Sequence, residues 1–267
     1  MPGFCHPLGM ADALRLLDEP ELRGPDLLLA FEGWNDAGEA ATSAVRFLAD
    51  ALGAAPLAEI DPEEFFDFTV TRPQVRLGEG GVRKIDWPRF EFSHACGPER
   101  DLILGIGPEP HTRWRAFCDC VLDVAKRFGV RRVILFGSFL ADVLYSRPVG
   151  VTGFASESGQ LERLGITPTG YEGPTGIVGV LGDCFRLEQL EVLSCWAGLP
   201  HYIDSSPNPR GALALVQHMA PYLGIGVDER PLREAAGEFE ERISALVASD
   251  PTLAEYVKQL KRRDFAQ

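Results

Sequence analysis

Short apolar runs alternate with amphipathic stretches along most of the chain, which predicts strands that alternate with helices. The first run is "LLLAFE" at 27–32, and similar runs return as "DLILG", "RRVILF" and "EVLSCWAGLP". Between these runs, apolar residues recur at helical intervals, as over 36–52 and 112–128. This order is typical of a mostly parallel sheet with helices on both faces. We therefore predict a three-layer αβα fold with a mixed, mostly parallel sheet.

Residues 63–93 depart from this pattern. "FFDFTVTR" and "QVRLGEGGVRKIDWP" alternate or turn through a glycine-rich tip, as the strands of a hairpin do. We predict an antiparallel excursion here, inside an α/β core that covers residues 1–226. The segments 231–248 and 251–263 indicate two acidic helices, so we expect residues 227–267 to form a helical extension packed on the core.

One predicted helix, within "YEGPTGIVGVLGDCFRLEQL", has a glycine at every third position. These glycines are Gly173, Gly176, Gly179 and Gly182. Glycines along one side let a helix approach a neighbouring backbone closely. We expect Gly176→Leu or Gly179→Leu to cost about 1 to 3 kcal/mol through overpacking.

The charge of the chain disfavours several classes of partner. The 267 residues include 26 basic and 39 acidic side chains, for a formal net charge of −13. This balance disfavours binding to nucleic acid and to anionic membranes. No apolar run is long enough to span a bilayer, and the first residues lack the basic start and apolar core of a secretion signal, so we expect a cytoplasmic protein. The six cysteines show no C-x-x-C spacing, and we predict neither a metal nor a cofactor.

Four loops at the ends of predicted strands hold the candidate site residues. In open α/β sheets, ligands bind outside the carboxyl ends of the strands. The loops are "EGWNDAG" (32–38), "GIGPEPHTRWR" (105–115), "GSFLAD" (137–142) and the segment 197–210, which starts with "AGLPHYI". Their candidate residues are Glu32, Trp34, Asn35, Asp36, Glu109, His111, Arg113, Arg115, Ser138, His201 and Asp204.

The "EGWNDAG" turn has two interpretations. Glu32 and Asp36 could act as an acid and base pair if Trp34 formed an apolar wall that raised the pKa of one carboxyl. Alternatively, Asp36 caps the next helix, with Glu39 at the spacing of a capping box, and Glu32 only ends a strand. A tight turn does not need a side chain as large as Trp34, so we expect it to line a pocket or a subunit contact.

The loop that contains Glu109 and His111 is open to two interpretations as well. Arg113 or Arg115, at the start of a helix, could bind a phosphate or carboxylate through two hydrogen bonds, or the helix start could simply be solvated. The loop has Pro110 in place of the third glycine of G-x-G-x-x-G, which argues against a dinucleotide site.

The last two loops do not predict an esterase. His201 and Asp204 lie three residues apart, but the loop of Ser138 lacks a G-x-S-x-G elbow. In "SSPNPR", at 205–210, a serine or the asparagine is expected to cap a helix that has Pro209 in its first turn.

The order of segments along the whole chain resembles the proteasome assembly chaperone 2 (PAC2) family, in its bacterial branch. The matching segments are "EGWNDAGEAA", "LILGIGPEPHTRW", "VILFGSFLAD", "YEGPTGIVGVL" and "SSPNPRGALALV", within about residues 10–250. The resemblance implies a fold similar to purine nucleoside phosphorylases and a non-catalytic protein-binding or assembly factor. It implies a homo-oligomer, with a trimer as the first expectation, and proteasome subunits or another protein as partners.

Some members of the family end in a tail of a hydrophobic residue, a tyrosine and any residue, which docks on the proteasome ring. This chain ends in "KRRDFAQ" and departs from that pattern, since Asp264 is not hydrophobic. Docking through the tail is therefore not implied.

The phosphorylase-like fold leaves a second function open, a small-molecule enzyme or sensor of nucleosidase or phosphorylase type. Glu32, Asn35, Asp36, Arg113 and Arg115 would surround its ligand, although none matches a phosphorylase motif residue by residue. This function predicts a concave pocket where Trp34, Glu32 and an arginine converge. An assembly factor predicts an exposed apolar patch instead. No catalytic residue is assigned.

Overall fold

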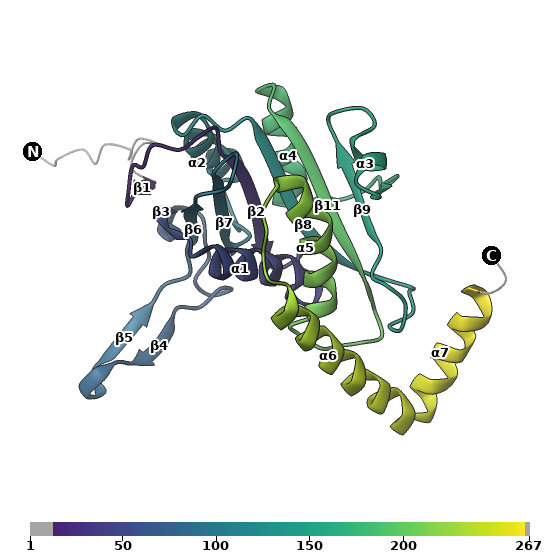
Figure 1. The fold of residues 1–267 in the computed structure, drawn as a ribbon. Helices are drawn as coiled ribbons and strands as arrows, with labels where there is room; N and C mark the ends of the chain where they lie inside the picture. Colours follow the sequence, from purple (N-terminus) through teal and green to yellow (C-terminus); the bar gives the residue numbers. More distant parts are fainter. Residues whose placement is uncertain (1–12, 265–267) are drawn as a thin grey trace, which may run out of the picture.

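The computed structural model describes residues 13–264, and its centre is a nine-stranded sheet between two layers of helices (Figure 1). The strands of this sheet are, in spatial order, β1 (Leu14–Leu16), β3 (Ala55–Ile60), β6 (Phe90–Ala95), β7 (Leu102–Pro108), β2 (Asp26–Glu32), β8 (Arg132–Ala141), β11 (Glu191–Pro200), β9 (Val151–Ala155) and β10 (Thr167–Pro168). The four central strands, β7, β2, β8 and β11, run parallel. On the two sides, β6 and β9 run antiparallel to their central neighbours. The predicted mixed, mostly parallel α/β fold is confirmed.

Helices cover both faces of the sheet because its central strands are apolar on both sides. The helices are α1 (Ala40–Leu52), α2 (Trp114–Arg127), α3 (Gln160–Arg163), α4 (Ile177–Leu187), α5 (Pro209–Leu223), α6 (Arg230–Ser249) and α7 (Pro251–Asp264). In β2, Leu27, Leu29 and Phe31 belong to the core under α2 and α4. Leu28 and Ala30 belong to the core under α1 and α5. Successive side chains of one strand thus fill two separate cores.

A buried ion pair joins the amino ends of two central strands. Arg132 at the start of β8 donates from Nε to Asp26 Oδ1 over 2.7 Å, and a second bond joins the guanidinium to Asp26 Oδ2. Asp26 is only 1% exposed. The carboxylate therefore depends mainly on Arg132 for compensation of its charge, while Arg100 lies farther away at 3.9 Å.

Two predicted elements have different bounds in the structure. β8 continues to Ala141, so "GSFLA" is strand and not loop, because β11 offers a paired partner as far as Pro200. The glycine-rich helix α4 begins only at Ile177, so Gly173 and Gly176 precede it and the prediction of a helix side lined by four glycines is wrong. The extended backbone of Gly176 ends the preceding loop.

Two projections extend from the edge of the sheet where the parallel strands end (Figure 1). The first, which we call the arm, is residues 70–87 and contains the antiparallel hairpin of β4 (Gln74–Leu77) and β5 (Arg83–Asp86). "FFDFTVTR", expected as a strand, instead follows a 3-10 turn at Pro62–Glu64 and buries Phe65 and Phe66 in the body.

The second projection, the hook, consists of α6 and α7. A small apolar cluster joins the two helices to the loops after β8 and β11; it contains Leu144, Ile203, Phe239, Ile243, Val247, Val257 and Leu260. That residues 227–267 form a separate unit on the core stays a prediction. Between residues 13 and 264, no helix is long and apolar enough to cross a membrane.

Candidate functional site

The carboxyl ends of β2 and β7 and the start of α4 meet at a buried polar cluster. Glu109 Oε1 accepts hydrogen bonds from Asn35 Nδ2 at 2.9 Å and from the backbone N–H of Ile177 at 2.7 Å. Glu109 thus caps α4, where an anion is favoured by the unpaired amides and the helix dipole. Asn35 is fully buried, and its Oδ1 finds no hydrogen-bond donor in the part of the chain that the structure describes. Two predicted site residues therefore do meet, but they bind each other and a helix end.

Asp36, which is buried at the same edge of the sheet, caps α1. Its carboxylate accepts from the N–H of Ala41 at 2.7 Å and from the hydroxyl of Thr42, and Ser138 Oγ lies 3.3 Å from Asp36 Oδ1. Burial raises the pKa of the Asp36 carboxyl, and the hydrogen bonds from Thr42, Ala41 and Ser138 oppose that rise without cancelling it. The structural interpretation of Asp36 as a cap is therefore confirmed.

The expected capping box is wrong. A 3-10 turn at Ala37–Glu39 separates Asp36 from α1, which begins at Ala40. Glu39 has a positive φ of 50° and makes no capping hydrogen bond with its side chain. The turn moves the capped amides to five and six residues after Asp36, and sequence spacing alone did not indicate this insertion.

Glu32 and Trp34 point away from this buried cluster. Glu32 pairs with Arg46 of α1 at 2.5 Å, so the arginine that it meets is neither Arg113 nor Arg115. Trp34 is 61% exposed. A ring that exposed does not shield Glu32 or Asp36 from water, and the burial of Asp36 comes from α1 and β8 instead. A subunit contact for Trp34 stays a prediction.

His111 and Arg113 hold the base of the arm. His111 Nδ1 accepts from the N–H of Asp67 at 2.8 Å, and Arg113 forms an ion pair with Glu64. The Arg113 guanidinium also lies 5.9 Å from the centre of the Phe65 ring. Arg115 is exposed at the first turn of α2, as a solvated helix start requires.

The last candidates, His201 and Asp204, lie on the loop after β11. His201 Nδ1 is 3.2 Å from Asp142 Oδ1, and its ring packs edge-on against Tyr202 and Tyr256. Asp204 is exposed. Ser138 is fully buried and donates to Ala37 O at 2.8 Å. Among residues 13–264, no polar contact joins Ser138 to either candidate, so the structure brings no serine, histidine and aspartate together.

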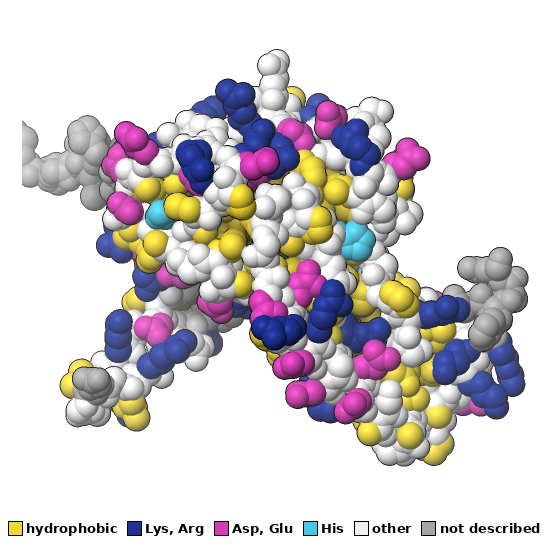
Figure 2. All heavy atoms as spheres, in the orientation of Figure 1, with side chains coloured by type: hydrophobic (Ala, Val, Ile, Leu, Met, Phe, Trp, Pro, Cys, Tyr) yellow, Lys and Arg dark blue, Asp and Glu magenta, His cyan; other side chains and the backbone are white. Residues whose placement is uncertain are grey.

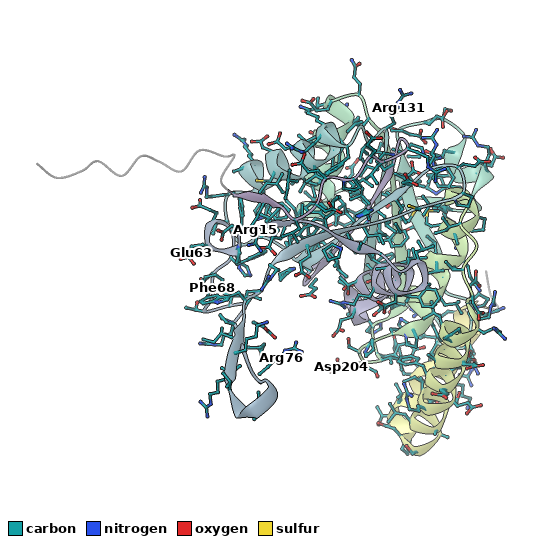
Figure 3. The ribbon with its side chains drawn as sticks, turned by 60° about the vertical axis from the view of Figure 1, so that its left-hand side comes forward. Arg15, Glu63, Phe68, Arg76, Arg131 and Asp204 are labelled. Carbon is teal, nitrogen blue, oxygen red and sulfur yellow. The ribbon has the colours of Figure 1, made fainter. Side chains whose placement is uncertain are left out.

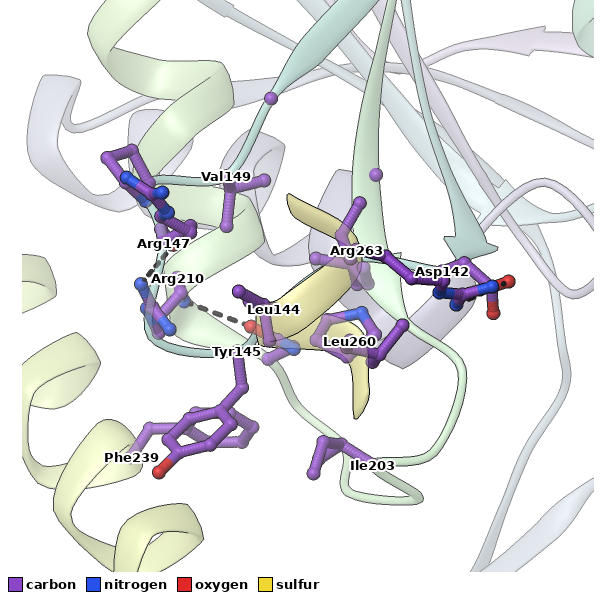
Figure 4. Close-up of a pocket in the computed structure, with 17 residues that line it drawn as sticks. Asp142, Leu144, Tyr145, Arg147, Val149, Ile203, Arg210, Phe239, Leu260 and Arg263 are labelled. Carbon is purple, nitrogen blue, oxygen red and sulfur yellow. Dashed lines mark hydrogen bonds and ion pairs between the residues drawn. The ribbon is translucent and has the colours of Figure 1, made fainter. Parts of the chain in front are cut away.

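A cavity that the sequence did not indicate lies between the sheet edge and the hook (Figure 4). It measures about 500 Å³, and its walls come from the end of β11, the loops after β8 and β11, and α5 to α7. Arg210 Nη2 donates to Arg147 O at 2.7 Å, and Arg263 is 3.4 Å from Asp142. The residues are far apart in sequence and share no pattern, so only the fold brings them together. Across the described chain, no cluster of three or more His, Cys, Asp or Glu side chains could hold a metal ion.

Comparison with protein families matches residues 30–247 to the PAC2 family. The chain belongs to the PAC2 family. Among solved structures, this PAC2 protein is similar to the proteasome-assembly chaperone homologue Rv2125 of Mycobacterium tuberculosis, at 40% identity and a TM-score of 0.79, over 87% of this chain and 99% of that one. A PAC2 family protein of Streptomyces avermitilis has 38% identity, the same TM-score of 0.79 and the same coverage of 87% and 99%.

A more distant archaeal structure shares the fold. The proteasome activator PbaB of Pyrococcus furiosus is 20% identical, with a TM-score of 0.70 over 87% of this chain and 97% of that one. At this identity the likeness concerns the fold alone. A comparison with curated proteins gave no match. The family indicated by the order of sequence segments is therefore confirmed.

Proposed function

We propose that this PAC2 protein is a non-catalytic factor that binds other protein subunits during their assembly, and that it acts as a homo-oligomer. One observation carries the proposal: at the carboxyl edge of the sheet, polar side chains are used internally while large apolar side chains are exposed. Glu109 and Asp36 cap α4 and α1, and Glu32 pairs with Arg46. Trp34, by contrast, stands in solvent. An edge of this kind favours contact with a protein surface over chemistry on a small molecule.

Proteasome subunits are the first partners to test. The names of the relatives support this choice, since one is a proteasome-assembly chaperone homologue and another a proteasome activator. The acidic charge of the chain adds long-range attraction to a basic partner surface. A trimeric assembly, the similarity to purine nucleoside phosphorylases and the cytoplasm as compartment stay predictions beside this one.

The test is reconstitution with the proteasome α and β subunits of the same organism, followed by native mass spectrometry. We expect a complex of defined stoichiometry with free α subunits and none with the completed core particle, as an assembly factor requires. Trp34→Ala is expected to weaken the complex, and Trp114→Phe serves as the matched tryptophan control, because Trp114 packs against the core and is only partly exposed.

A different pair of results would contradict the proposal. If neither subunit binds at micromolar concentration, while the protein isolated from its own cells retains a nucleotide, sugar or phosphate ester in stoichiometric amount, the small-molecule function replaces the proposal. The retained compound then names the substrate class.

A further inference from the structure

Two thiols meet where α2 and α4 pack on the sheet. Cys118 of α2 is 1% exposed and belongs to the core under these helices, and Cys184 of α4 is half-buried and packs against the same core. The Cys184 thiol lies within hydrogen-bonding reach of the Cys118 thiol. Burial, and the neighbouring Cys184 after it, raise the pKa of the Cys118 thiol. Two reduced cysteines on different helices are therefore in contact.

The two helices run side by side beyond this contact (Figure 1). Near their carboxyl ends, Lys126 Nζ of α2 lies 2.8 Å from Oε2 of Glu188, the residue that follows α4. Both contacts therefore advance in the same direction along the two helices. Figure 3 labels Arg131, in the loop just after α2, at this end of the molecule. An ion pair and a pair of thiols thus join the same two helices at separate points.

No other two thiols are in contact within residues 13–264. Cys120 is also on α2, but residues two positions apart point to different sides of a helix. Cys195 lies in the core on the opposite face of the sheet, where its sulfur is 3.9 Å from that of Met219. Cys96 is exposed in the loop after β6. These three cysteines are natural controls for the pair.

The two thiols differ in how easily a reagent can reach them. Lys and Arg side chains are among the groups that cover the end of the molecule where α2 and α4 lie (Figure 2). Lys126, Arg127 and Arg186 are exposed there. Beneath such a surface, only a small reagent reaches the half-buried Cys184, and Cys118 is more deeply buried still. Because reactivity follows exposure, Cys184 is the thiol that reacts first.

We infer that Cys118 and Cys184 form a reversible disulfide when the protein meets hydrogen peroxide, and that this bond ties α4 to α2. The inference goes beyond the proposed function and does not depend on it. Hydrogen peroxide is small and uncharged, as access to Cys184 requires.

The oxidation takes two balanced steps. The Cys184 thiolate attacks one peroxide oxygen, so that an S–O bond forms and the O–O bond breaks, and the hydroxide that leaves takes up the thiol proton as water. The Cys118 sulfur then attacks the sulfur of this sulfenic acid. The S–S bond forms, the S–O bond breaks, and the leaving hydroxide takes the Cys118 proton as a second water. Two sulfurs are oxidised and one peroxide is reduced, and a thiol reverses the bond by exchange.

The bond changes how α4 is held. In the reduced protein, Glu109 caps the first turn of α4, and the pair of Lys126 with Glu188 at the other end is exposed and adds little. A disulfide would add a covalent tie between these points. Because it closes a long loop between sulfurs that are already in contact, it restricts mainly the unfolded chain. We expect oxidation to raise the Tm by about 10 °C.

The first test treats the folded protein with hydrogen peroxide, blocks the remaining thiols and maps the tryptic peptides without reduction. Peptide 116–126 contains Cys118 and Cys120, and peptide 164–186 contains Cys184. We expect the two peptides to be joined with the loss of two hydrogen atoms, and to separate in dithiothreitol. Cys120→Ala should keep the link, which assigns it to Cys118. Cys184→Ala should abolish it.

Thermal unfolding followed by circular dichroism tests the tie between the helices. The rise of about 10 °C in Tm after peroxide should appear in the wild type and in Cys120→Ala, and dithiothreitol should remove it. Cys96→Ala lacks an exposed thiol outside the pair and should behave like the wild type. Cys184→Ala should unfold at the same temperature before and after peroxide.

Three results would overturn the inference. Oxidised Cys184 without a link to peptide 116–126 would show that the two thiols touch but cannot join. Loss of the link in Cys120→Ala would assign the bond to the wrong cysteine of α2. A link that lowers the Tm would show that the helices must move apart from their packed positions to form it. All three readings use the wild type or Cys120→Ala, so they do not require Cys118→Ala to fold, and none bears on binding to proteasome subunits.

Discussion

Gly176 is the residue whose replacement most directly tests the polar cluster at the sheet edge. An ideal Cβ at this position would lie 2.3 Å from Asn35 Oδ1 and 2.7 Å from Glu109 Oε1. The backbone of Gly176 is extended, with φ −89° and ψ −172°, which any residue adopts without strain. Gly176→Ala therefore acts only through contacts. It must push Asn35 or Glu109 out of position.

The expected cost follows from what that displacement breaks. The hydrogen bonds from Asn35 Nδ2 and from the N–H of Ile177 to Glu109 share one carboxylate oxygen, so moving it affects both. A buried polar group left without its partner costs about 1 to 3 kcal/mol. We expect Gly176→Ala to lower the free energy of unfolding by about 2 to 4 kcal/mol. At about 2 to 4 °C per kcal/mol for a chain of this size, a loss of about 3 kcal/mol lowers the Tm by about 6 to 12 °C.

Gly182→Ala is the matched control, because it adds the same methyl group a few residues away. The nearest atom to a Cβ at Gly182 is Leu135 Cδ1 at 3.4 Å, an ordinary contact. Alanine is favoured over glycine inside a helix, so this variant should gain about 0.5 to 1 kcal/mol. Urea unfolding followed by circular dichroism measures both. The account of the cluster is refuted if Gly176→Ala unfolds like the wild type, or if Gly182→Ala loses as much stability.

Three further predictions concern other buried or glycine positions. Arg132→Met should lower the free energy of unfolding by about 3 to 5 kcal/mol, since it leaves the buried Asp26 carboxylate with only Arg100, 3.9 Å away, and adding Asp26→Leu should recover much of the loss in urea melts. The pKa of Asp36 is higher in the folded than in the unfolded chain, so the wild type should lose stability relative to Asp36→Asn as pH rises above 3.8, until the raised pKa is passed. Parallel pH profiles of unfolding for these two proteins would contradict that. Gly179→Leu, which the sequence alone led us to expect to overpack the helix, should instead cost little in the same melts, because Gly179 is exposed and the atom nearest to its Cβ is the Thr175 hydroxyl, which can turn away.

The elements of the fold were predictable from the sequence where burial leaves a regular pattern. The apolar run at 191–200 predicted β11, although residues 197–200 were also assigned to the loop that follows, and α5 was correct at its start with Asn208 as cap, because an apolar run and a capping motif are local signals. The regular spacing of glycines before and within α4 led to the wrong prediction that all four lie on one side of a helix. Gly176 is needed by the side chains of Asn35 and Glu109, which lie far away in the sequence, and not by a neighbouring helix.

The candidate site was predictable only in part. Asn35, Asp36, Glu109 and Ser138 were selected from three separate loops, and the topology does bring them to one edge through direct contacts. Their roles were not readable, since a carboxylate that caps a helix and one that moves protons occupy the same sequence position. The cavity under the hook exists because α6 and α7 pack beside the edge of the sheet. No local sequence pattern predicts where these two helices pack.

At this edge of the sheet, two carboxylates chosen as site candidates hold helix ends, and a large aromatic side chain is exposed. A catalytic carboxylate has to reach a substrate, yet Asp36 is sealed behind α1 and Glu109 is committed to the first turn of α4. Leu77 in the arm and Trp34 in the turn after β2 are both exposed to solvent. Burying either side chain would stabilise the protein. Carboxylates that cap helices make the edge of the sheet rigid. Exposed apolar side chains beside them give this rigid edge a surface on which another protein can pack. Such an edge suits binding between protein chains, and the reconstitution with proteasome subunits tests that binding directly.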